Sequence, residues 1–437
     1  MKYKSLFSVK TLTCLSLLAG AVMTAHADQK AVIKAAMEQD PPAMNINTGW
    51  EIPSKDYCDQ PYVVKLKDGT WLCVMTTAEG HEGNSSQHVV STRSKDKGKT
   101  WSPLVEIEPP SGPEASWVMP YLTPYGRVYA FYTYNAENRR EVIAGKPNYR
   151  NRVDTLGQYA FKYSDDGGKS WSEERRFLPI RETDIDRNNP YKGRVRFFWG
   201  VGKPITHKNA MYFGFTKVRV FAEPLFISDS EGWFMKSDNI LTEKNPDKLN
   251  WQLLPDGENP IVGPGTKGSI NSEVNLTSLS DGSLFCVYRT IEGHPGQAYS
   301  RDDGKTWTES AFMTYGPNGP KVSHPRAACP VYRLEEGPYA GRYLFWFHNQ
   351  DGKAPYRTHH RNPAFLLGGV EVDGPDGKLI KWGKPLAILY DKNPSTRISY
   401  PDFIWDDGLY ITETQKKTAR VHPISDDYLQ KLWEGLE

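Results

Sequence analysis

The chain has 437 residues, 38% hydrophobic and 24% charged, which is enough apolar material for one large domain or two ordinary ones. Its formal net charge of +2 gives no global field that would attract nucleic acid or an anionic membrane, so neither is expected as a partner. Aromatic residues reach 12%, which suits a many-stranded β fold or a sugar-stacking surface.

The N-terminus has the pattern of an export signal. Three lysines within the first ten residues precede an apolar run over residues 12–23, and Ala25-His26-Ala27 forms a small-x-small cleavage site. That run is too short for a membrane anchor, and no later stretch offers eighteen uninterrupted apolar residues. We predict a signal peptide over residues 1–27, cleaved after Ala27, and a secreted or periplasmic mature chain that is not inserted in a membrane.

Four cysteines follow the signal peptide: Cys58, Cys73, Cys286 and Cys329. No pair has the CxxC spacing of a zinc or redox site, so we expect no metal and no cofactor. Cys73 and Cys286 occupy matching places in two similar segments, and we expect both to be buried free thiols.

Three segments share the pattern Ser-x-Asp-x-Gly-x-(Ser/Thr)-Trp: SKDKGKTW at 94–101, SDDGGKSW at 164–171 and SRDDGKTW at 300–307. In such a hairpin turn the Asp accepts hydrogen bonds from its own backbone, the Gly supplies a positive φ, and the Trp packs against a strand. We therefore expect a structural role for these aspartates. The starts lie 70 and 136 residues apart, so a further copy is expected midway, and SDSEGW at 228–233 is a degraded candidate.

Short alternating strands recur between these turns, in six places: PYVVKLKDGTWLCVM, GRVYAFYTY, NAMYFGFTKV, SLFCVYRT, GRYLFWFHN and GLYITET. Strong helix is confined to the C-terminus, where Ser425 could cap DDYLQKLWEGL. Six β units without a low-complexity linker predict a single all-β domain over residues 28–437, a six-bladed β-propeller with a short C-terminal helix. Units one and four would then face each other across the central channel.

Two segments of these units echo each other without a gap: DGTWLCVMTTAEGHEG at 68–83 and DGSLFCVYRTIEGHPG at 281–296. One carries Thr76 where the other carries Arg289. Their histidines, His81 and His294, follow equivalent strands and could form an acid/base pair or bind sugar hydroxyls. The alternative is a loop turn inherited by duplication.

Other segments of the chain resemble the sialidase (BNR or Asp-box repeat) superfamily. Glu273 is followed sixteen residues later by Arg289 and then by an Asp box, in SEVNLTSLSDGSLFCVYRT. Tyr400 precedes a Gly-turn strand in RISYPDFIWDDGLYITET, and Arg361 lies in HHRNPAFLLGG. The resemblance implies a propeller of sialidase type in which Tyr400 is the nucleophile, Glu273 its base, and Arg289 and Arg361 the ligands of a substrate carboxylate.

The chain departs from the family pattern in its first blade. Where sialidases have Arg-Ile-Pro, this sequence has Asp59-Gln60-Pro61, and Gln60 becomes a substrate-binding candidate. Where the family places an acid/base Asp, the loop AEGHEGNSSQHVV at 78–90 has none. It offers histidines and Glu82 instead, and His81 is our candidate for the group that protonates the leaving group.

Two further residues are candidates for substrate contact. Trp199, in RVRFFWG, could stack on a sugar or pack in the core. Asp402, two residues after Tyr400, could bind the ligand or fasten a turn. The adjacent pair His359 and His360 would point to opposite faces of a strand, so they do not suggest a metal site.

The resemblance implies a secreted glycoside hydrolase that removes a terminal acidic sugar from a glycan by a retaining Tyr/Glu mechanism. A second hypothesis is a polysaccharide lyase or unusual glycosidase on uronate-containing glycans. There an arginine neutralises the uronate and a His or Tyr moves the C5 proton, so His81, His294 and Arg289 would carry the chemistry. A third is a glycan-binding propeller without catalysis. All three predict a glycan or oligosaccharide as partner, and they leave the oligomeric state open.

Overall fold

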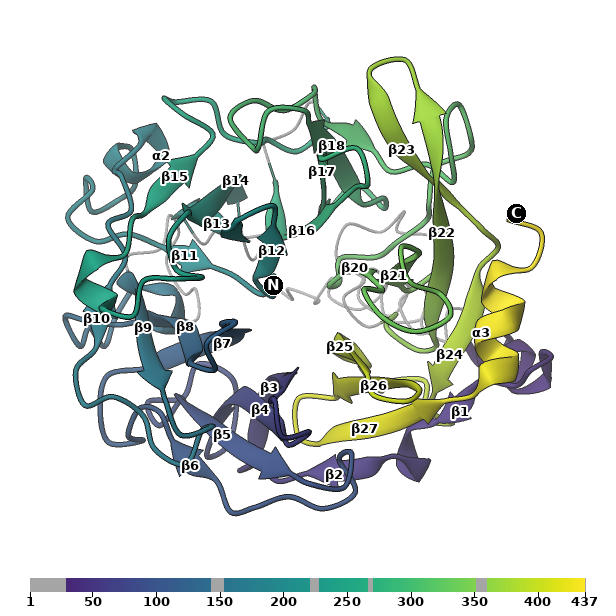
Figure 1. Ribbon diagram of the computed structural model, residues 1–437, viewed down its shortest axis with the longest axis horizontal. Coiled ribbons are helices and arrows are strands. Elements are labelled where there is room, and N and C mark those ends of the chain that lie inside the picture. The colour runs from purple at the N-terminus through teal and green to yellow at the C-terminus, as the bar shows by residue number, and fades with distance from the viewer. Residues whose placement is uncertain (1–28, 143–152, 221–227, 266–269, 351–359, 437) are drawn as a thin grey trace, which may run out of the picture.

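The computed structural model describes residues 29–142, 153–220, 228–265, 270–350 and 360–436. Six β-sheets surround a central channel, and the chain passes once around the ring (Figure 1). The predicted fold class, an all-β six-bladed propeller, is confirmed. The predicted signal peptide lies outside the described residues. Within the described ranges, no helix has the length and apolar character needed to cross a membrane.

The first three blades follow in chain order, and in blades 1 and 2 the first-named strand lies nearest the channel (Figure 1). Blade 1 comprises β3 (Tyr57–Lys65), β4 (Trp71–Ala78), β5 (His88–Ser94) and β6 (Val105–Glu106). Blade 2 comprises β7 (Ala115–Leu122), β8 (Val128–Tyr134), β9 (Gln158–Ser164) and β10 (Arg176–Phe177). Blade 3 comprises β11 (Phe198–Trp199), β12 (Ile205–His207), β13 (Ala210–Val220), β14 (Ser228–Ser237) and β15 (Gln252–Leu254).

Blades 4 to 6 complete the ring. Blade 4 comprises β16 (Ser272–Ser278), β17 (Leu284–Arg289), β18 (Gly296–Ser300) and β19 (Ala311–Phe312). Blade 5 comprises β20 (Val331–Arg333), β21 (Tyr343–Phe347), β22 (Ala364–Gly374), β23 (Gly377–Trp382) and β24 (Leu386–Tyr390), with β1 (Met44–Asn45) added in parallel to β24. Blade 6 comprises β25 (Ser399–Trp405), β26 (Leu409–Thr414), β27 (Ala419–Ile424) and β2 (Trp50–Ile52). Blades 1 and 4 lie on opposite sides of the channel, as expected (Figure 1).

The two ends of the described chain meet in blade 6. Its outermost strand, β2, pairs antiparallel with β27, with Trp50 opposite Val421. The ring is therefore closed by backbone hydrogen bonds between strands from the two ends of the described chain. The C-terminal helix α3 (Asp426–Trp433) follows β27, and the Ser425 hydroxyl caps it by accepting from the Tyr428 N–H, as predicted.

Helical segments are otherwise short and lie in the connections. They are residues 29–38, α2 (Asp184–Arg187) and the 3₁₀ turns η1 (Ile46–Thr48), η2 (Val153–Thr155) and η3 (Pro246–Lys248). Buried aromatic and aliphatic side chains fill the space between neighbouring blades. Cys73 and Cys286 are buried and free in matching strands, as expected.

The Asp boxes form the predicted turns between the third and fourth strands of blades 1, 2 and 4. In the first, Asp96 accepts from the Thr100 N–H at 2.8 Å and from its hydroxyl at 2.6 Å, while the Ser94 hydroxyl donates to Asp96 at 2.8 Å. Gly98 has a φ of 85°, which favours glycine. Asp166 and Asp302 repeat these contacts, so all three carboxylates are used within their own turns.

The degraded Asp box was placed wrongly by the sequence. Residues 228–233 belong to strand β14, which pairs with β13, and they form no turn. The equivalent turn of blade 3 follows β14: Asn239 accepts from the Asn250 N–H at 2.8 Å, just before Trp251. The Ser237 hydroxyl lies 3.4 Å from Asn239, as Ser94 lies beside Asp96. A longer loop between Asn239 and Asn250 hides this copy from a fixed spacing.

Asn239 takes in blade 3 the place that Asp96 takes in blade 1, and this predicts how substitutions of Asp96 affect stability. Asp96→Ala leaves the Thr100 N–H and the Ser94 hydroxyl without their acceptor and should lower the free energy of unfolding by about 1–3 kcal/mol. Asp96→Asn keeps one acceptor oxygen, as Asn239 does, and should cost less than half as much. Chemical denaturation of both variants checks this, and equal losses would contradict it.

Candidate functional site

Four innermost strands carry a β-bulge at the same level of the channel. The bulges lie in β3, β7, β16 and β25, and each places one non-glycine residue at positive φ: Gln60 (56°), Trp117 (55°), Glu273 (57°) and Tyr400 (51°). Such backbone is uncommon for these residue types and occurs preferentially at functional sites. The repeated bulge therefore marks a ring of four positions where blades 1, 2, 4 and 6 present special side chains.

Glu273 joins side chains from three blades. Its Oε1 accepts from the Tyr400 hydroxyl at 2.9 Å, from Trp199 Nε1 at 3.2 Å, and forms an ion pair with Arg289 Nη1 at 2.7 Å. All four residues are buried. Burial and the charge of Glu273 raise the pKa of Tyr400. Glu273 Oε2 has no hydrogen-bond partner within the described part of the chain, so one buried carboxylate oxygen stays available.

Two serines next to the bulges orient two arginines. Ser272 precedes Glu273, and its hydroxyl accepts from Arg289 Nε at 2.9 Å. Ser399 precedes Tyr400, and its hydroxyl accepts from Arg361 Nη1 at 2.9 Å. Arg289 stands opposite Ser272 in the β16–β17 ladder, the place that Thr76 takes opposite Asp59 in blade 1. The sequence difference between the two echoed segments is thus a difference at the site.

A third arginine, Arg326, belongs to the same group and was missed in the sequence. Its backbone carbonyl accepts from Arg361 Nη2 at 3.1 Å. Burial and the positive charges of Arg289 and Arg361 lower the pKa of Arg326, while Glu273 and Tyr400 oppose this. We call Arg289, Arg326 and Arg361 the arginine group. The only sequence signal for Arg326 is its place in HPRAACP, before the first strand of blade 5.

Two stacked histidines lie next to the arginine group and contact the backbone beside Arg326. The rings of His324 and His348 are buried, with centroids 5.9 Å apart and an interplanar angle of 15°. His324 Nδ1 accepts from the His348 backbone N–H at 3.2 Å, and Nε2 donates to the carbonyl of Ala327, the neighbour of Arg326, at 2.9 Å. Burial, together with Arg361 and Arg289, lowers the pKa of His324 to about 3.

These histidines predict acid sensitivity. His324 ordinarily titrates at 6.5, so between that pH and about 3 the unfolded chain binds a proton that the folded chain does not. Stability is therefore complete above pH 6.5 and falls on acidification, by roughly 2–3 kcal/mol near pH 4.5 from His324 alone. Denaturation at a series of pH values checks this. His324→Gln should flatten the slope, and the matched substitution of the exposed His81 should not; an unchanged slope in His324→Gln contradicts the assignment.

Trp199 is brought to the site, but not as an open platform. Its ring stacks on Trp117, with centroids 4.3 Å apart, and both rings are buried. Its Nε1 donates to Glu273. Of the two alternatives for Trp199, packing in the core fits this burial, and its Nε1 orients the Glu273 carboxylate.

The two echoed histidines do not form a pair. His294 Nδ1 donates to the Val322 carbonyl at 2.8 Å, and its ring lies against Phe312 in β19, the outermost strand of blade 4. His294 therefore ties the edge of its blade and is not among the site residues. His81 is exposed, and its Nδ1 bonds the Glu82 carbonyl at 2.9 Å. The next residue, Glu82, is nearer to the site, because its Oε2 lies 3.7 Å from Lys416 Nζ.

Gln60 and Asp59 occupy the first-blade position that differs from the family pattern. Gln60 is buried, and neither its Nε2 nor its Oε1 has a hydrogen-bond partner among the described residues. Asp59 accepts from the Tyr57 hydroxyl at 2.8 Å and from the Gln60 N–H at 3.1 Å, and forms an ion pair with Lys416. A buried amide with two unused polar atoms is a place where a polar ligand group would be stabilised.

The Asp402 carboxylate links neighbouring blades by hydrogen bonds. Its Oδ2 accepts from Lys203 Nζ and from the Val63 N–H, both at 2.7 Å, and its Oδ1 accepts from the Phe403 N–H at 2.9 Å. These contacts tie blade 6 to blades 1 and 3. Of the two roles considered for Asp402, these contacts favour the structural one over substrate binding, since both oxygens are already in use.

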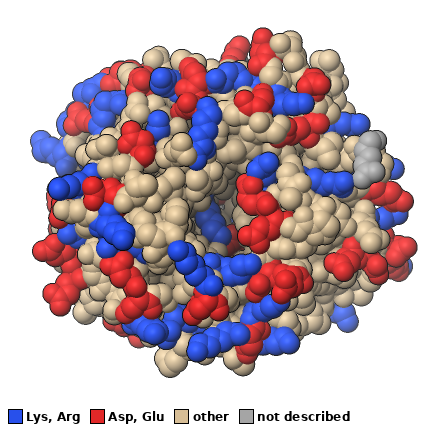
Figure 2. All heavy atoms as spheres, in the orientation of Figure 1, with Lys and Arg blue, Asp and Glu red and all other residues tan. Residues whose placement is uncertain are grey.

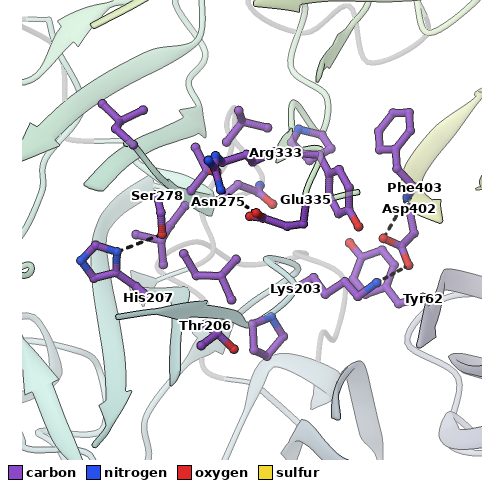
Figure 3. Close-up of a pocket in the computed structure, with 18 of the residues that line it drawn as sticks. Tyr62, Lys203, Thr206, His207, Asn275, Ser278, Arg333, Glu335, Asp402 and Phe403 are labelled. Carbon is purple, nitrogen blue, oxygen red and sulfur yellow. Dashed lines mark hydrogen bonds and ion pairs between the residues drawn. The ribbon is translucent and has the colours of Figure 1, made fainter. Parts of the chain in front are cut away.

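Asp402 also lines a separate cavity of about 680 Å³, in the direction of the Asp-box turns. Figure 3 shows Tyr62, Lys203, Asn275, Arg333 and Glu335 around it. Tyr62, Asn275 and Asp402 each follow a bulge residue by two positions, so the cavity is the continuation of the channel beyond the site. Figure 2 shows a hollow at the centre of the ring with both signs of charge around it. Charged side chains that line the cavity pair with each other, as Lys203 does with Asp402 and Arg333 with Glu335.

The candidate site consequently contains a phenol, its carboxylate partner and three arginines in a buried cluster. A family model for the BNR/Asp-box repeat matches residues 162–173, which contain the second Asp box. Among curated protein sequences, no match to the chain is found.

Solved structures match the whole propeller at low identity. The intramolecular trans-sialidase from Ruminococcus gnavus, in complex with oseltamivir carboxylate, is 15% identical, with a TM-score of 0.58 over 87% of this chain and 96% of its own. A Dyadobacter fermentans protein of unknown function is 16% identical, with a TM-score of 0.57 over 85% of this chain and 96% of its own. Trypanosoma rangeli sialidase with sialic acid is 15% identical, with a TM-score of 0.57 over 89% of this chain and 59% of its own. The likeness shows a shared fold.

Proposed function

We propose that this protein is a glycoside hydrolase that removes a terminal acidic sugar from a glycan with retention of configuration. The observation that carries the proposal is the Tyr400 hydroxyl donating to Glu273 at 2.9 Å, with Glu273 ion-paired to Arg289. A phenol is a weak nucleophile at its ordinary pKa and needs a base in contact to accept its proton. Glu273 is a carboxylate in that position, and the bulges of β16 and β25 hold the two residues together.

In the proposed reaction, Tyr400 Oη attacks the anomeric carbon while its proton passes to Glu273. The bond from that carbon to the leaving oxygen breaks, and an acid in the first-blade loop, which carries His81 and Glu82, protonates this oxygen. Water then attacks the anomeric carbon of the tyrosyl-sugar intermediate and gives its proton to the loop group that acted as acid in the first step. As the Tyr400–carbon bond breaks, Glu273 returns its proton to Tyr400 Oη, which restores the starting state. A neutral phenol is suited to a centre that bears a carboxylate, because an anionic nucleophile would be repelled.

The charge of the site supports an anionic sugar. Three guanidinium groups lie in this cluster, and Arg289 among them is ion-paired with Glu273 beside Tyr400. Guanidinium binds carboxylate through two parallel hydrogen bonds, and burial strengthens such pairs. Two of the similar structures hold acids, oseltamivir carboxylate in the Ruminococcus gnavus enzyme and sialic acid in the Trypanosoma rangeli enzyme. The substrate is proposed to place its carboxylate on the arginine group.

The lyase hypothesis receives less support. It requires His81 and His294 to act with Arg289 on one substrate, but His294 lies at the outer edge of blade 4. The third hypothesis, a propeller that binds glycans without catalysis, is distinguished from the hydrolase by the following experiment.

Mass spectrometry of glycans after incubation with the purified protein tests the proposal. The panel contains sialylated, uronate-bearing and neutral oligosaccharides. Release of an acidic monosaccharide with uptake of one water supports a hydrolase, and release with unsaturation at the new end supports a lyase. Binding of an acidic glycan without any released sugar on the whole panel would reject catalysis.

Arg326 gives a residue-level test of the acid preference. Arg326→Gln should raise KM for an acidic substrate by about tenfold or more, with a smaller change in kcat, because charge-assisted bonds to a carboxylate are lost in both ground and transition states. Arg176→Gln is the matched control, since Arg176 pairs with Asp247 on the exposed outer edge. Equal KM values for Arg326→Gln and wild type would exclude Arg326 from carboxylate binding.

We also propose that the protein is exported. The support is the N-terminal pattern alone: basic residues, a short apolar run and Ala25-His26-Ala27. Expression of the full chain followed by N-terminal sequencing of exported protein should give Asp28 as the first residue.

A further inference from the structure

The junction of blades 6 and 1 places a lysine against the candidate nucleophile. Lys416 lies in the turn between β26 and β27, and its Nζ is 4.6 Å from the centre of the Tyr400 ring. No arginine of the arginine group comes from this side of the channel, since these residues belong to blades 4 and 5. The side chain is only partly accessible, at 21%.

Backbone and side-chain contacts hold Lys416 in this place. Its φ is 76°, its N–H donates to the Thr414 hydroxyl at 2.9 Å, and its carbonyl accepts from the Cys58 N–H at 3.2 Å. Its ammonium forms ion pairs with Asp59 and, at 3.7 Å, with Glu82. A non-glycine residue at positive φ is uncommon, and these contacts fix the backbone of Lys416 in that conformation.

The ammonium remains charged in this environment. Burial opposes the charge, but Asp59, Glu82 and Tyr400 outweigh it and raise the pKa of Lys416. A cation over an aromatic face is attracted by the neutral ring, and it attracts a phenolate far more strongly because a full negative charge forms.

Tyr400 is faced by charged and titratable groups from four blades. Glu273 and Arg289 come from blade 4, Arg326 from blade 5, Lys416 from blade 6, and Asp59 and Tyr62 from blade 1. Glu273 and Asp59 disfavour a phenolate, and Lys416 and Arg289 favour it. Arg289 already neutralises Glu273 at 2.7 Å, whereas Lys416 lies over the ring itself.

We propose that Lys416 is a positioning residue that stabilises the phenolate form of Tyr400, with Asp59 and Glu82 holding its ammonium over the ring. It thereby eases proton transfer from Tyr400 to Glu273 and offers a cation from blade 6, whereas the arginine group comes from blades 4 and 5. The inference rests on the proposed role of Tyr400 as nucleophile.

The titration of Tyr400 itself tests this inference, without any substrate. A fluorinated tyrosine is introduced at position 400, where its fluorines lower the phenol's pKa into the stable pH range, and ¹⁹F NMR follows its ionisation in the full chain. Lys416→Met should raise the midpoint by about one pH unit, a tenfold weaker acid. Lys416→Arg should restore most of the shift, because the positive charge is kept.

A matched control comes from the same junction of blades. Lys97 also joins blade 1 to blade 6, through the Asp406 carbonyl at 2.9 Å and Asp407 at 3.2 Å, but it does so at the Asp-box turns. Lys97→Met should leave the midpoint of the label unchanged. Thermal denaturation of each variant shows that the comparison is made on folded protein.

Two results would overturn the proposal. One is an equal or lower midpoint in Lys416→Met than in the parent, and the other is a parent label that does not ionise below the pH at which the fold is lost. The outcome is separate from that of the proposed function. A shifted midpoint in a protein that releases no sugar would retain Lys416 and reject the hydrolase, and an unshifted midpoint in an active enzyme would do the reverse.

Discussion

Replacing Tyr400 by phenylalanine is expected to abolish sugar release while leaving the fold intact. The substitution removes a single oxygen from a buried ring. Glu273 Oε1 keeps the Arg289 and Trp199 contacts, so no buried charge is left alone. The free energy of unfolding should change by no more than about 1–2 kcal/mol, the worth of one hydrogen bond. Turnover should fall by at least about a thousandfold, because the covalent route is lost.

Steady-state rates on the glycan identified by mass spectrometry, together with thermal denaturation, check this result. Binding of the acidic sugar should persist in Tyr400→Phe, because the arginine group is unchanged. A matched control is Tyr125→Phe, which removes a hydroxyl that bonds the Glu243 carbonyl in the outer part of the ring. Wild-type turnover in Tyr400→Phe would refute Tyr400 as nucleophile and leave the fold assignment untouched.

Replacing Glu273 by glutamine is expected to have a double effect. The uncharged amide cannot take the Tyr400 proton, so turnover should fall to a similar degree. Arg289, which is itself buried, also loses its 2.7 Å partner. Breaking one side of a buried ion pair costs about 3–5 kcal/mol, because the remaining charge is uncompensated. Glu273→Gln should therefore be clearly less stable than Tyr400→Phe.

A double-mutant cycle separates the two effects of Glu273. Glu273→Gln with Arg289→Gln removes both charges, and much of the lost stability should return because no lone charge stays buried. Turnover should not return. Additive losses of stability in the double variant would mean that the two residues do not depend on each other, contrary to the observed ion pair.

The predictions from sequence succeeded where the signal was local. The Asp-box turns depend on hydrogen bonds within eight residues, so Asp96, Asp166 and Asp302 could be interpreted correctly from the pattern alone. Ser425 as a helix cap is similarly local. The blade 3 turn was missed because Asn239 and Asn250 make the same bonds across a longer loop, which no fixed spacing reveals.

Interpretation of single site residues was less secure, since their roles depend on partners far along the chain. His294 looked equivalent to His81, but its ring is used against Phe312. Asp402 looked available beside Tyr400, but a lysine and a backbone N–H from other blades occupy it. Nothing local distinguishes a free carboxylate from an occupied one.

By itself, the sequence determined the six-bladed β-propeller, its Asp-box turns and the candidate pair Tyr400 and Glu273, because repeated turn chemistry and one family-like motif encode them. Only the tertiary structure decided what surrounds that pair: Arg326 in the arginine group, the histidine stack behind it, and Lys416 over the ring. These residues belong to different blades and meet only when the ring closes, when β2 pairs with β27 and the two ends of the chain come together. Ring closure joins residues that are far apart in the sequence, so local sequence patterns do not show which residues surround Tyr400 and Glu273.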